Sequence, residues 1–204
     1  MTLPPCAPNP PRPLVLASTS RYRRELLARL RVPFDVVAAP VDETPRPGET
    51  PQAAARRLAL AKAAAGAALR PDAVVIGSDQ TATIDGTAIV GKPGDHAAAL
   101  AQLRAASGRT LWFHTAVAVA DASQPQPAID VVSTRVAFRT LTEREIDDYL
   151  RAEQPYDCAG AAKAEGLGIA LLETIDGPDP TALIGLPLIR LSAMLRAAGY
   201  RIPG

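Results

Sequence analysis

The chain has 204 residues, of which 48% are apolar and 21% charged, and its net charge is +1. This composition is typical of a globular protein and excludes a disordered chain. Because the overall charge is close to neutral, no global field favours nucleic acid or an anionic membrane, and neither is expected as a partner. Any bound anion must therefore be held by positively charged residues that cluster locally.

The N-terminal segment is rich in proline, with six prolines in the first thirteen residues. Residues 1–12 are therefore predicted to be a disordered tail, followed by a single domain over residues 13–204. There is no basic segment leading into an apolar one and no apolar run near 18 residues, which argues against secretion and membrane spanning. Cys6 and Cys158 do not make a disulfide framework. A cytoplasmic location is expected.

The first half of the chain alternates strand and helix signals. An apolar strand over residues 14–17 ends in Ser18-Thr19-Ser20, and Ser20 is a suitable N-cap for the helix that carries Leu26, Leu27 and Leu30. A second strand is predicted over residues 34–38. A proline-rich loop with Asp42-Glu43 follows, and then an alanine-rich helix over about residues 52–69.

The second half begins with a buried strand at residues 73–76 that runs into Gly77-Ser78-Asp79-Gln80. Asp85-Gly86 predicts a hairpin turn before a short strand. The remaining elements are a helix at 95–106, a strand pair at 110–121 and 129–138, a helix from Thr142 to Arg151 with a capping box at Glu145, a strand at 168–173, and a final helix opened by Pro187. The alternation of strands and helices predicts an α/β fold.

Two strand ends carry groups suited to anion chemistry. Ser18, Arg23 and Arg24 lie where a strand meets a helix N-terminus, a place that binds anions but is also an ordinary helix start. Asp79 stands just past the carboxyl end of a strand, where ligands bind in open α/β sheets, although an aspartate there also caps turns. Gln80 beside it offers an amide for a base edge or a phosphate.

Lysine is rare in this chain, which has nineteen arginines and only Lys62, Lys92 and Lys163. A compact ammonium is retained where a guanidinium does not fit, or by chance on the surface. The stem of Lys62 is expected to be covered on the helix face shared with Leu58 and Leu69, which a snorkelling lysine would also explain. The spacing from Gly86 to Lys92 imitates a P-loop, but Pro93 replaces the required hydroxyl and rules that motif out.

Cysteine and zinc chemistry are not expected. Cys158 has only His96 and His114 as possible bases, and neither histidine stands in a catalytic motif. Two histidines and two cysteines are also too few to favour a structural zinc site.

The ordered set of motifs from Leu14 to Gly199 resembles the Maf family of nucleotide pyrophosphatases. Arg21 departs from the pattern by replacing the usual proline, and Ala161 stands where a hydroxyl is common. The motifs that carry the resemblance are Leu16-Ala17-Ser18-Thr19-Ser20 with Arg23-Arg24, Val41-Asp42-Glu43-Thr44, Lys62, Gly77-Ser78-Asp79-Gln80, Gly91-Lys92-Pro93, Cys158-Ala159-Gly160, Lys163, Glu165-Gly166 and Ile184-Gly185-Leu186-Pro187.

The resemblance implies a two-lobed α/β fold similar to inosine triphosphatases, with an active-site cleft between the lobes. It implies hydrolysis of nucleoside triphosphates between the first and second phosphates, with Asp79 as general base, a divalent metal, Mg²⁺ or Mn²⁺, as cofactor, and often a homodimer. Arg23, Arg24, Lys62, Lys92 and Lys163, with Ser18, would bind the triphosphate. Glu43 would hold the metal or orient water.

Within the family, the Ser18-to-Arg24 motif, Gln80 and the Lys163-to-Gly166 segment most resemble the branch that acts on 7-methyl-GTP. A methylated, cationic guanine gains from stacking on Tyr22, although Tyr22 could also be a plain exposed aromatic. A carboxylate at Glu165 can accept both guanine donors, N1–H and N2–H. The alternatives are a dTTP or UTP pyrophosphatase of the same family, and a non-catalytic nucleotide-binding regulator of cell division.

Overall fold

In the computed structural model, which describes residues 12–122 and 124–202, the strands pair in one mixed sheet in the order β2-β1-β3-β4-β5-β6. In this sheet β1 pairs in parallel with both β2 and β3. The pairs β3–β4, β4–β5 and β5–β6 are antiparallel. The strands are β1 (Leu14–Leu16), β2 (Asp35–Val36), β3 (Val74–Thr83), β4 (Thr110–Asp121), β5 (Ala128–Phe138) and β6 (Leu172–Asp176).

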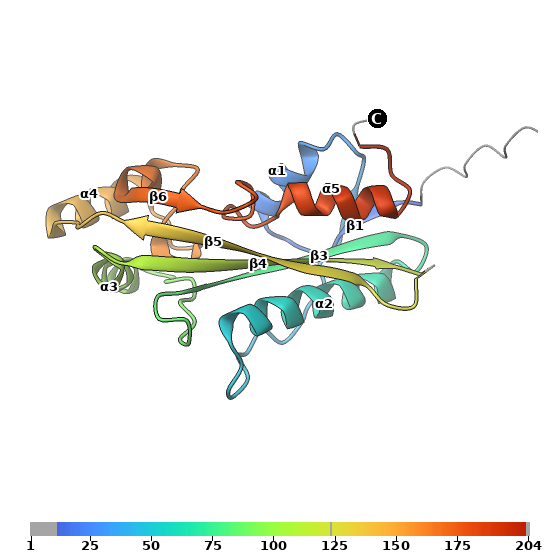
Figure 1. The fold of residues 1–204 in the computed structure, drawn as a ribbon, viewed down its shortest axis with the longest axis horizontal. Helices are drawn as coiled ribbons and strands as arrows, with labels where there is room; N and C mark the ends of the chain where they lie inside the picture. The colour runs from blue at the N-terminus through green and yellow to red at the C-terminus, as the bar shows by residue number, and fades with distance from the viewer. Residues whose placement is uncertain (1–11, 123, 203–204) are drawn as a thin grey trace, which may run out of the picture.

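Helices cover the sheet differently along its length (Figure 1). On one side of the first lobe lie α1 (Arg21–Ala28) and α5 (Leu188–Ala197), and α2 (Pro51–Leu69) covers the opposite side. The second lobe holds α3 (His96–Ala106), α4 (Glu143–Glu153) and the short 3₁₀ helices η1 (Ala159–Ala161) and η2 (Leu167–Leu171). The long strands β3, β4 and β5 run through both lobes, so the two share one sheet.

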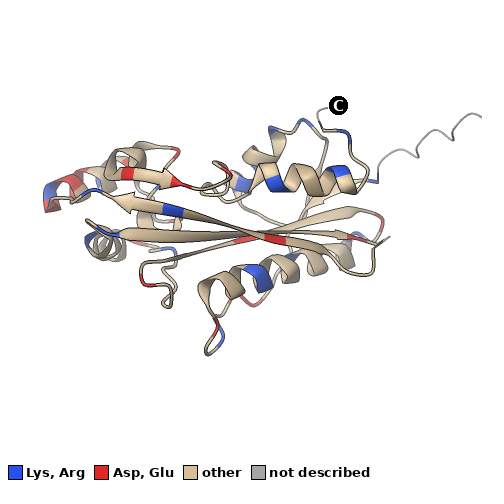
Figure 2. Cartoon of the chain, viewed as in Figure 1, with Lys and Arg blue, Asp and Glu red and all other residues tan. Residues whose placement is uncertain are grey.

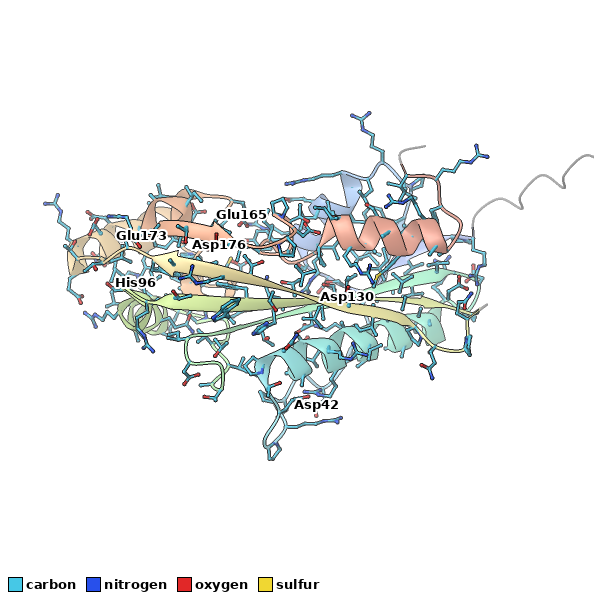
Figure 3. The ribbon with its side chains drawn as sticks, viewed as in Figure 1. Asp42, His96, Asp130, Glu165, Glu173 and Asp176 are labelled. Atoms are coloured by element: carbon cyan, nitrogen blue, oxygen red, sulfur yellow. The ribbon has the colours of Figure 1, made fainter. Side chains whose placement is uncertain are left out.

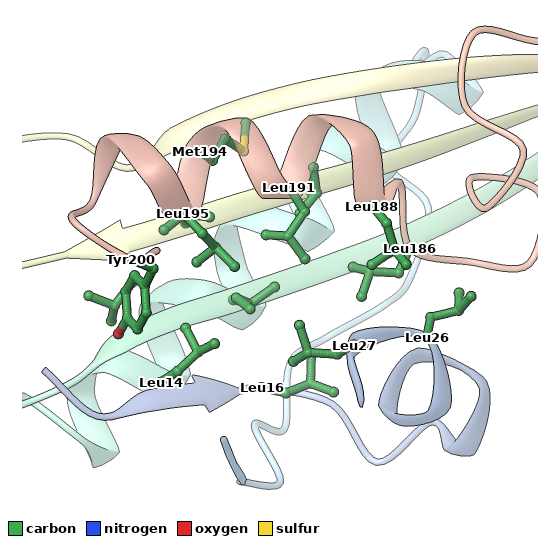
Figure 4. Close-up of a cluster of buried hydrophobic side chains, with 14 residues drawn as sticks. Leu14, Leu16, Leu26, Leu27, Leu186, Leu188, Leu191, Met194, Leu195 and Tyr200 are labelled. Atoms are coloured by element: carbon green, nitrogen blue, oxygen red, sulfur yellow. The ribbon is translucent and has the colours of Figure 1, made fainter. Parts of the chain in front are cut away.

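Because successive side chains of a strand point to opposite faces, the first lobe has one apolar cluster on each side of the sheet, and the second lobe has a cluster of its own. In the first lobe, Leu14 and Leu16 pack under α1 and α5 (Figure 4). Ile76 belongs to the same cluster, whereas Val15 and Val75 belong to the cluster on the α2 side. In the second lobe, a separate cluster gathers the beginning of β4 and the end of β5 against α3 and α4. The predicted α/β class and two-lobed mixed sheet are confirmed.

Charged residues of both signs are interspersed over the two lobes (Figure 2). This distribution agrees with the near-neutral net charge of the chain.

Local capping signals are borne out. The Ser20 side chain accepts a hydrogen bond from the Arg23 amide at the start of α1, and Thr142 and Glu145 form the predicted capping box of α4. The helix predicted from residue 52 begins one residue earlier, with Thr50 as its N-cap.

Three sequence-based predictions are corrected. The strand predicted over 73–76 continues to Thr83 because β4 pairs with it along its whole length, so Asp79 lies inside β3. The strand predicted over 34–38 is only Asp35–Val36. The strand predicted over 168–173 begins at Leu172, because Gly168 packs against the Lys163 backbone and the chain first turns through η2.

The proline-rich segment is described only at its end. Residues 1–11 of the predicted tail lie outside the described residues. Arg12 pairs with Asp121, and its carbonyl accepts a hydrogen bond from the Tyr200 hydroxyl at 2.6 Å. The chain is therefore anchored to the first lobe from Arg12 onward.

Candidate functional site

The docking of α2 on β3 decides where the charged groups of the site meet. A Cβ on Gly77 would come within 2.3 Å of the Ala59 carbonyl oxygen and 2.4 Å of the Ala63 nitrogen. Only a glycine allows the helix backbone to approach the strand so closely. Lys62 precedes Ala63 on α2, and Asp79 follows Gly77 by two residues on the same face of β3. The close packing therefore holds their side chains together.

Lys62 bridges two carboxylates. Its Nζ lies 2.6 Å from Asp79 Oδ1 and 2.6 Å from Glu43 Oε1. The side chains of Lys62 and Asp79 are each 10% exposed, whereas that of Glu43 is 63% exposed. The hydrogen bond from Lys62 lowers the pKa of Glu43; burial opposes this shift, while the charges of Lys92 and Arg23 add to it. Predicted residues from separate segments thus form one cluster.

The prediction that Lys62 shares a covered face with Leu58 and Leu69 is half right. Lys62 and Leu58 are buried, but Leu69, the last residue of α2, is 57% exposed.

The N-terminus of α1 brings a further cation to the cluster. Ser18 is buried just before it, and its Oγ accepts a hydrogen bond from the Ser20 nitrogen at 3.2 Å. Arg23 Nε donates to the Gly185 carbonyl oxygen at 3.0 Å. Burial lowers the pKa of Arg23, and the carboxylates of Asp79 and Glu43 oppose that shift. The half-buried Arg23 guanidinium therefore faces the same region as the N-terminus of α1 and the Lys62 ammonium.

The turn that carries Gly185 depends on a residue that the sequence reasoning missed. Asp179 is 2% exposed; its Oδ1 accepts from the nitrogen and hydroxyl of Thr181 at 3.0 and 2.7 Å, and its Oδ2 accepts from the Ile189 nitrogen at 2.7 Å. Asp179 thus caps the start of α5 and fixes the preceding turn. The available signal was the Asp-Pro-Thr sequence before the last helix, which favours such a side-chain turn.

Gln80 points to the face of β3 opposite Asp79. Its Nε2 donates to Thr115 Oγ1 at 2.9 Å and to the carbonyl oxygens of Ala182 and Leu183 at 3.0 Å each. The amide nitrogen that was predicted to read a base edge or a phosphate is engaged by the protein itself. Gln80 ties β3 to the 182–185 turn at the cavity wall.

A different chemistry marks the other side of the cavity, around Tyr22. The Tyr22 hydroxyl donates to the two carboxylate oxygens of Asp157 at 3.3 and 3.4 Å, and Arg21 Cζ lies 4.8 Å from the ring centroid. Burial is the main cause that raises the pKa of Tyr22 to about 12. One ring face therefore already attracts a cation.

Cys158 stands beside this group as a thiol. Burial raises the pKa of Cys158 to about 11, and its Sγ lies 3.7 Å from the Tyr22 hydroxyl oxygen. A thiol with this pKa is protonated near neutral pH and is a poor nucleophile. The expectation that cysteine catalysis is absent agrees with this environment.

These groups line one cavity of about 970 Å³ between the lobes. Its volume falls in the range of small-molecule sites, about 300–1,000 Å³. Asp157, Arg21 and Thr81 contribute to the lining although the sequence reasoning gave them no role. The predicted residues on the lining are Ser18, Tyr22, Arg23, Glu43, Lys62, Asp79, Gln80, Lys92 and Glu165. Glu165 lies near the middle of the molecule's long axis (Figure 3).

Two predicted substrate-binding residues do not line this cavity. Arg24 is exposed on the outer surface of α1. Lys163 borders a smaller neighbouring hollow of about 300 Å³, and its Nζ lies 2.6 Å from Glu153 Oε1. The sequence placed both residues in motifs, but the direction of a side chain on a helix or a loop is decided by packing.

A metal-binding set made by the protein alone is not found in the described part of the chain, where no group of three histidine, cysteine or acidic side chains is placed to hold an ion. Glu43 and Asp79 instead form a pair on either side of Lys62. Mg²⁺ is commonly held by one or two carboxylates together with substrate phosphates, so this donor set fits an ion that binds with a triphosphate.

Within the described residues, no helix combines the length and the apolar character needed to span a membrane.

Comparison with known proteins places this arrangement in a family. A protein of Burkholderia pseudomallei named 7-methyl-GTP pyrophosphatase is 63% identical over 199 residues, covering 96% of this chain and 92% of the relative. Proteins with the same name from Polaromonas sp. and Ralstonia nicotianae are 62% and 57% identical, covering 94% and 92% of this chain and 87% and 96% of their own lengths. The family description of Maf-like proteins matches residues 13–198. The chain therefore belongs to the Maf family.

Proposed function

We propose that this protein hydrolyses nucleoside triphosphates between the α- and β-phosphates, with 7-methyl-GTP as its preferred substrate, and releases a nucleoside monophosphate and pyrophosphate. The observation that carries the proposal is the Lys62 ammonium held between Asp79 and Glu43 on the wall of an interlobe cavity. The relatives named 7-methyl-GTP pyrophosphatase, which match nearly the whole chain, support the same activity.

The phosphates would occupy the cationic end of the cavity. Arg23, Lys62 and Lys92 line this end, and the N-terminus of α1 adds backbone donors and a positive dipole. Phosphoryl transfer is accelerated mainly by positioning and charge stabilisation, which such groups supply. Arg24, outside the lining, would contribute only through the positive potential of the first turn.

Asp79 would act as the general base. Its carboxylate would accept a proton from a water molecule as the water oxygen bonds to the α-phosphorus. The bond from that phosphorus to the bridging oxygen breaks, and pyrophosphate leaves with the electron pair. Lys62 would hold the Asp79 carboxylate in place, because its Nζ already contacts Oδ1 at 2.6 Å.

Glu43, with the triphosphate, would hold a divalent cation, Mg²⁺ or Mn²⁺. When bound, such an ion stabilises negative charge that develops on the phosphates. The exposure of Glu43 suits this role, since a ligand from solvent can reach its carboxylate.

The nucleobase would occupy the Tyr22 end. A methylated guanine is cationic, and Tyr22 already holds the Arg21 guanidinium over its ring. The Glu165 carboxylate on the same wall would accept the N1–H and N2–H donors of guanine.

The cytoplasm is the proposed location of the protein, because the nucleotide pool there supplies the substrate. The proposed oligomeric state is a homodimer.

The test is a substrate panel. Pyrophosphate release is measured with one preparation on 7-methyl-GTP, GTP, dTTP and UTP, with Mg²⁺ or Mn²⁺. The highest kcat/KM is expected for 7-methyl-GTP. A higher value for dTTP or UTP would support the alternative specificity, and nucleotide binding without pyrophosphate release from any of them would support a non-catalytic regulator.

A further inference from the structure

Two residues of α4 hold the loop that precedes η2 and carries Glu165. The Tyr149 hydroxyl accepts a hydrogen bond from the Lys163 nitrogen at 3.0 Å. Glu153 Oε1 lies 2.6 Å from Lys163 Nζ, and its Oε2 accepts from the Leu167 nitrogen at 2.8 Å. The contacts to Glu153 therefore begin two residues before Glu165 and end two residues after it.

The clamped loop packs closely at its two glycines. A Cβ on Gly166 would lie 2.7 Å from Glu153 Oε2, and one on Gly168 would lie 2.6 Å from the Lys163 carbonyl oxygen. The Glu153 and Lys163 side chains are only 14% and 21% exposed, so their ion pair is partly shielded from solvent. The hydrogen bond from Lys163, with that from Leu167, lowers the pKa of Glu153, and the carboxylate remains charged near neutral pH.

This arrangement gives Lys163 a role other than holding phosphate. Its ammonium is directed to Glu153, and Lys163 is not part of the interlobe cavity lining in the described chain. Glu165 reaches the wall of the interlobe cavity and also borders the smaller hollow that Lys163 lines. The ion pair thus connects α4 to the loop that carries the acidic group proposed to read the guanine edge.

We propose that Glu153 is a positioning residue for base selection, which acts through Lys163 and Leu167 to hold Glu165 at the nucleobase end of the cavity. This inference rests on the proposed function, because it assigns the origin of its guanine preference. Glu153 does not line the cavity itself, so its influence on substrate must pass through the loop.

The test uses Glu153→Gln in the full-length protein, with kcat and KM measured for 7-methyl-GTP and for UTP, whose base lacks the two adjacent donors. KM for 7-methyl-GTP is expected to rise about tenfold, the order expected for losing one charge-assisted hydrogen bond, while kcat and the UTP constants stay unchanged. The matched control is Glu143→Gln, which removes an exposed ion pair with Arg104 from the same helix and should leave all constants unchanged.

A double-mutant cycle separates positioning from a general structural role. In a Glu165→Gln background, Glu153→Gln is expected to have no further effect on KM for 7-methyl-GTP. Additive losses, equal losses of kcat for both nucleotides, or wild-type selectivity in the single variant would each overturn the inference. If Glu153→Gln does not fold, Lys163→Met removes the same ion pair from the loop side and is judged by the same outcomes.

A binding measurement distinguishes failure of this inference from failure of the proposed function. A wild-type protein that releases no pyrophosphate would reject the enzymatic proposal, while calorimetric affinity for 7-methyl-GMP still tests Glu153. Weaker binding of this monophosphate by Glu153→Gln, with UMP binding unchanged, supports positioning. Equal binding of 7-methyl-GMP by variant and wild type rejects it.

Discussion

Two of the three lysines, Lys62 and Lys92, line the cavity between the lobes. Lys62 Nζ reaches Asp79 and Glu43 at 2.6 Å each, a geometry that a single tetrahedral ammonium satisfies between two carboxylates. Lys92 lines the same cavity from a loop of the other lobe. The scarcity of lysine in an arginine-rich chain was thus a useful signal for the cavity. It could not indicate that the third lysine, Lys163, forms an ion pair with Glu153 instead.

Tyr22 offers a direct test of cation recognition. Tyr22→Leu is expected to lower kcat/KM for 7-methyl-GTP about tenfold relative to GTP, because cation–π contacts contribute about 0.5–2 kcal/mol. Both nucleotides are assayed by pyrophosphate release. Tyr22→Phe is the matched control, since it keeps the ring and removes the hydroxyl that contacts Asp157. Equal losses of 7-methyl-GTP and GTP turnover in Tyr22→Leu would argue against stacking on a cationic base.

At the scale of elements, side-chain caps were predictable and tertiary boundaries were not. Ser20 and Thr142 cap their helices as their sequence patterns predict, because a cap is a contact within a few residues. The true end of β3 depends on pairing with β4, since Thr83 pairs with Trp112, which lies 29 residues later in the sequence. The turn through η2 depends on contact between Gly168 and Lys163, which a strand-like apolar pattern did not reveal.

The contact between α2 and β3 should control both folding and catalysis. Gly77→Ala would place a Cβ 2.3 Å from the Ala59 carbonyl oxygen, so α2 must move and carry Lys62 away from Asp79. Overpacking of this kind is expected to cost about 1–3 kcal/mol of unfolding free energy. Urea denaturation measures that loss, and pyrophosphate release should fall with it.

Gly91→Ala is the stability control for this variant, because a Cβ at Gly91 would meet no atom within 4 Å. Its urea midpoint should match that of the wild type. A Gly77→Ala protein with wild-type stability and turnover would show that the helix approach does not position the cluster.

The capping box of α4 predicts a pH dependence of stability. Hydrogen bonds from the Thr142 backbone and side chain, with Arg139, lower the pKa of Glu145 from 4.5 to about 2. Because the unfolded chain takes up this proton first as the pH falls, the contribution of Glu145 is present above pH 4.5 and is lost between there and about 2.

Urea midpoints at several pH values compare the wild type with Glu145→Gln. The difference between the two proteins should be largest near neutral pH and should shrink as the pH falls through this window. A difference independent of pH would reject the charged capping box as its source.

On the scale of the whole molecule, the site is assembled by a sheet that two lobes share. The cluster of Asp79, Lys62 and Glu43 joins a strand, a helix and a loop that lie far apart in the sequence. The motif order predicted which segments meet, since most of the predicted residues line one cavity. It could not predict that Gln80 would be engaged by the 182–185 turn or that Arg24 would face outward, because both follow from packing between segments.

Substrate and metal should stabilise the molecule together. A 7-methyl-GTP analogue with a methylene group between the α- and β-phosphates is expected to raise Tm in the presence of Mg²⁺. At a ligand concentration 100 times Kd, the gain in unfolding free energy is about 2.7 kcal/mol. EDTA should remove most of this gain, and Glu43→Gln should weaken the metal-dependent part. Equal stabilisation with and without Mg²⁺ would argue against a metal at Glu43.

Pyrophosphate release from 7-methyl-GTP by Asp79→Asn, compared with the wild type in the presence of Mg²⁺, decides whether the buried carboxylate of β3 is the catalyst. General bases contribute about 10²–10⁴-fold to rate, so kcat is expected to fall by that order while nucleotide binding is retained. Undiminished turnover in a folded Asp79→Asn protein would contradict the assignment and remove Asp79 from the reaction.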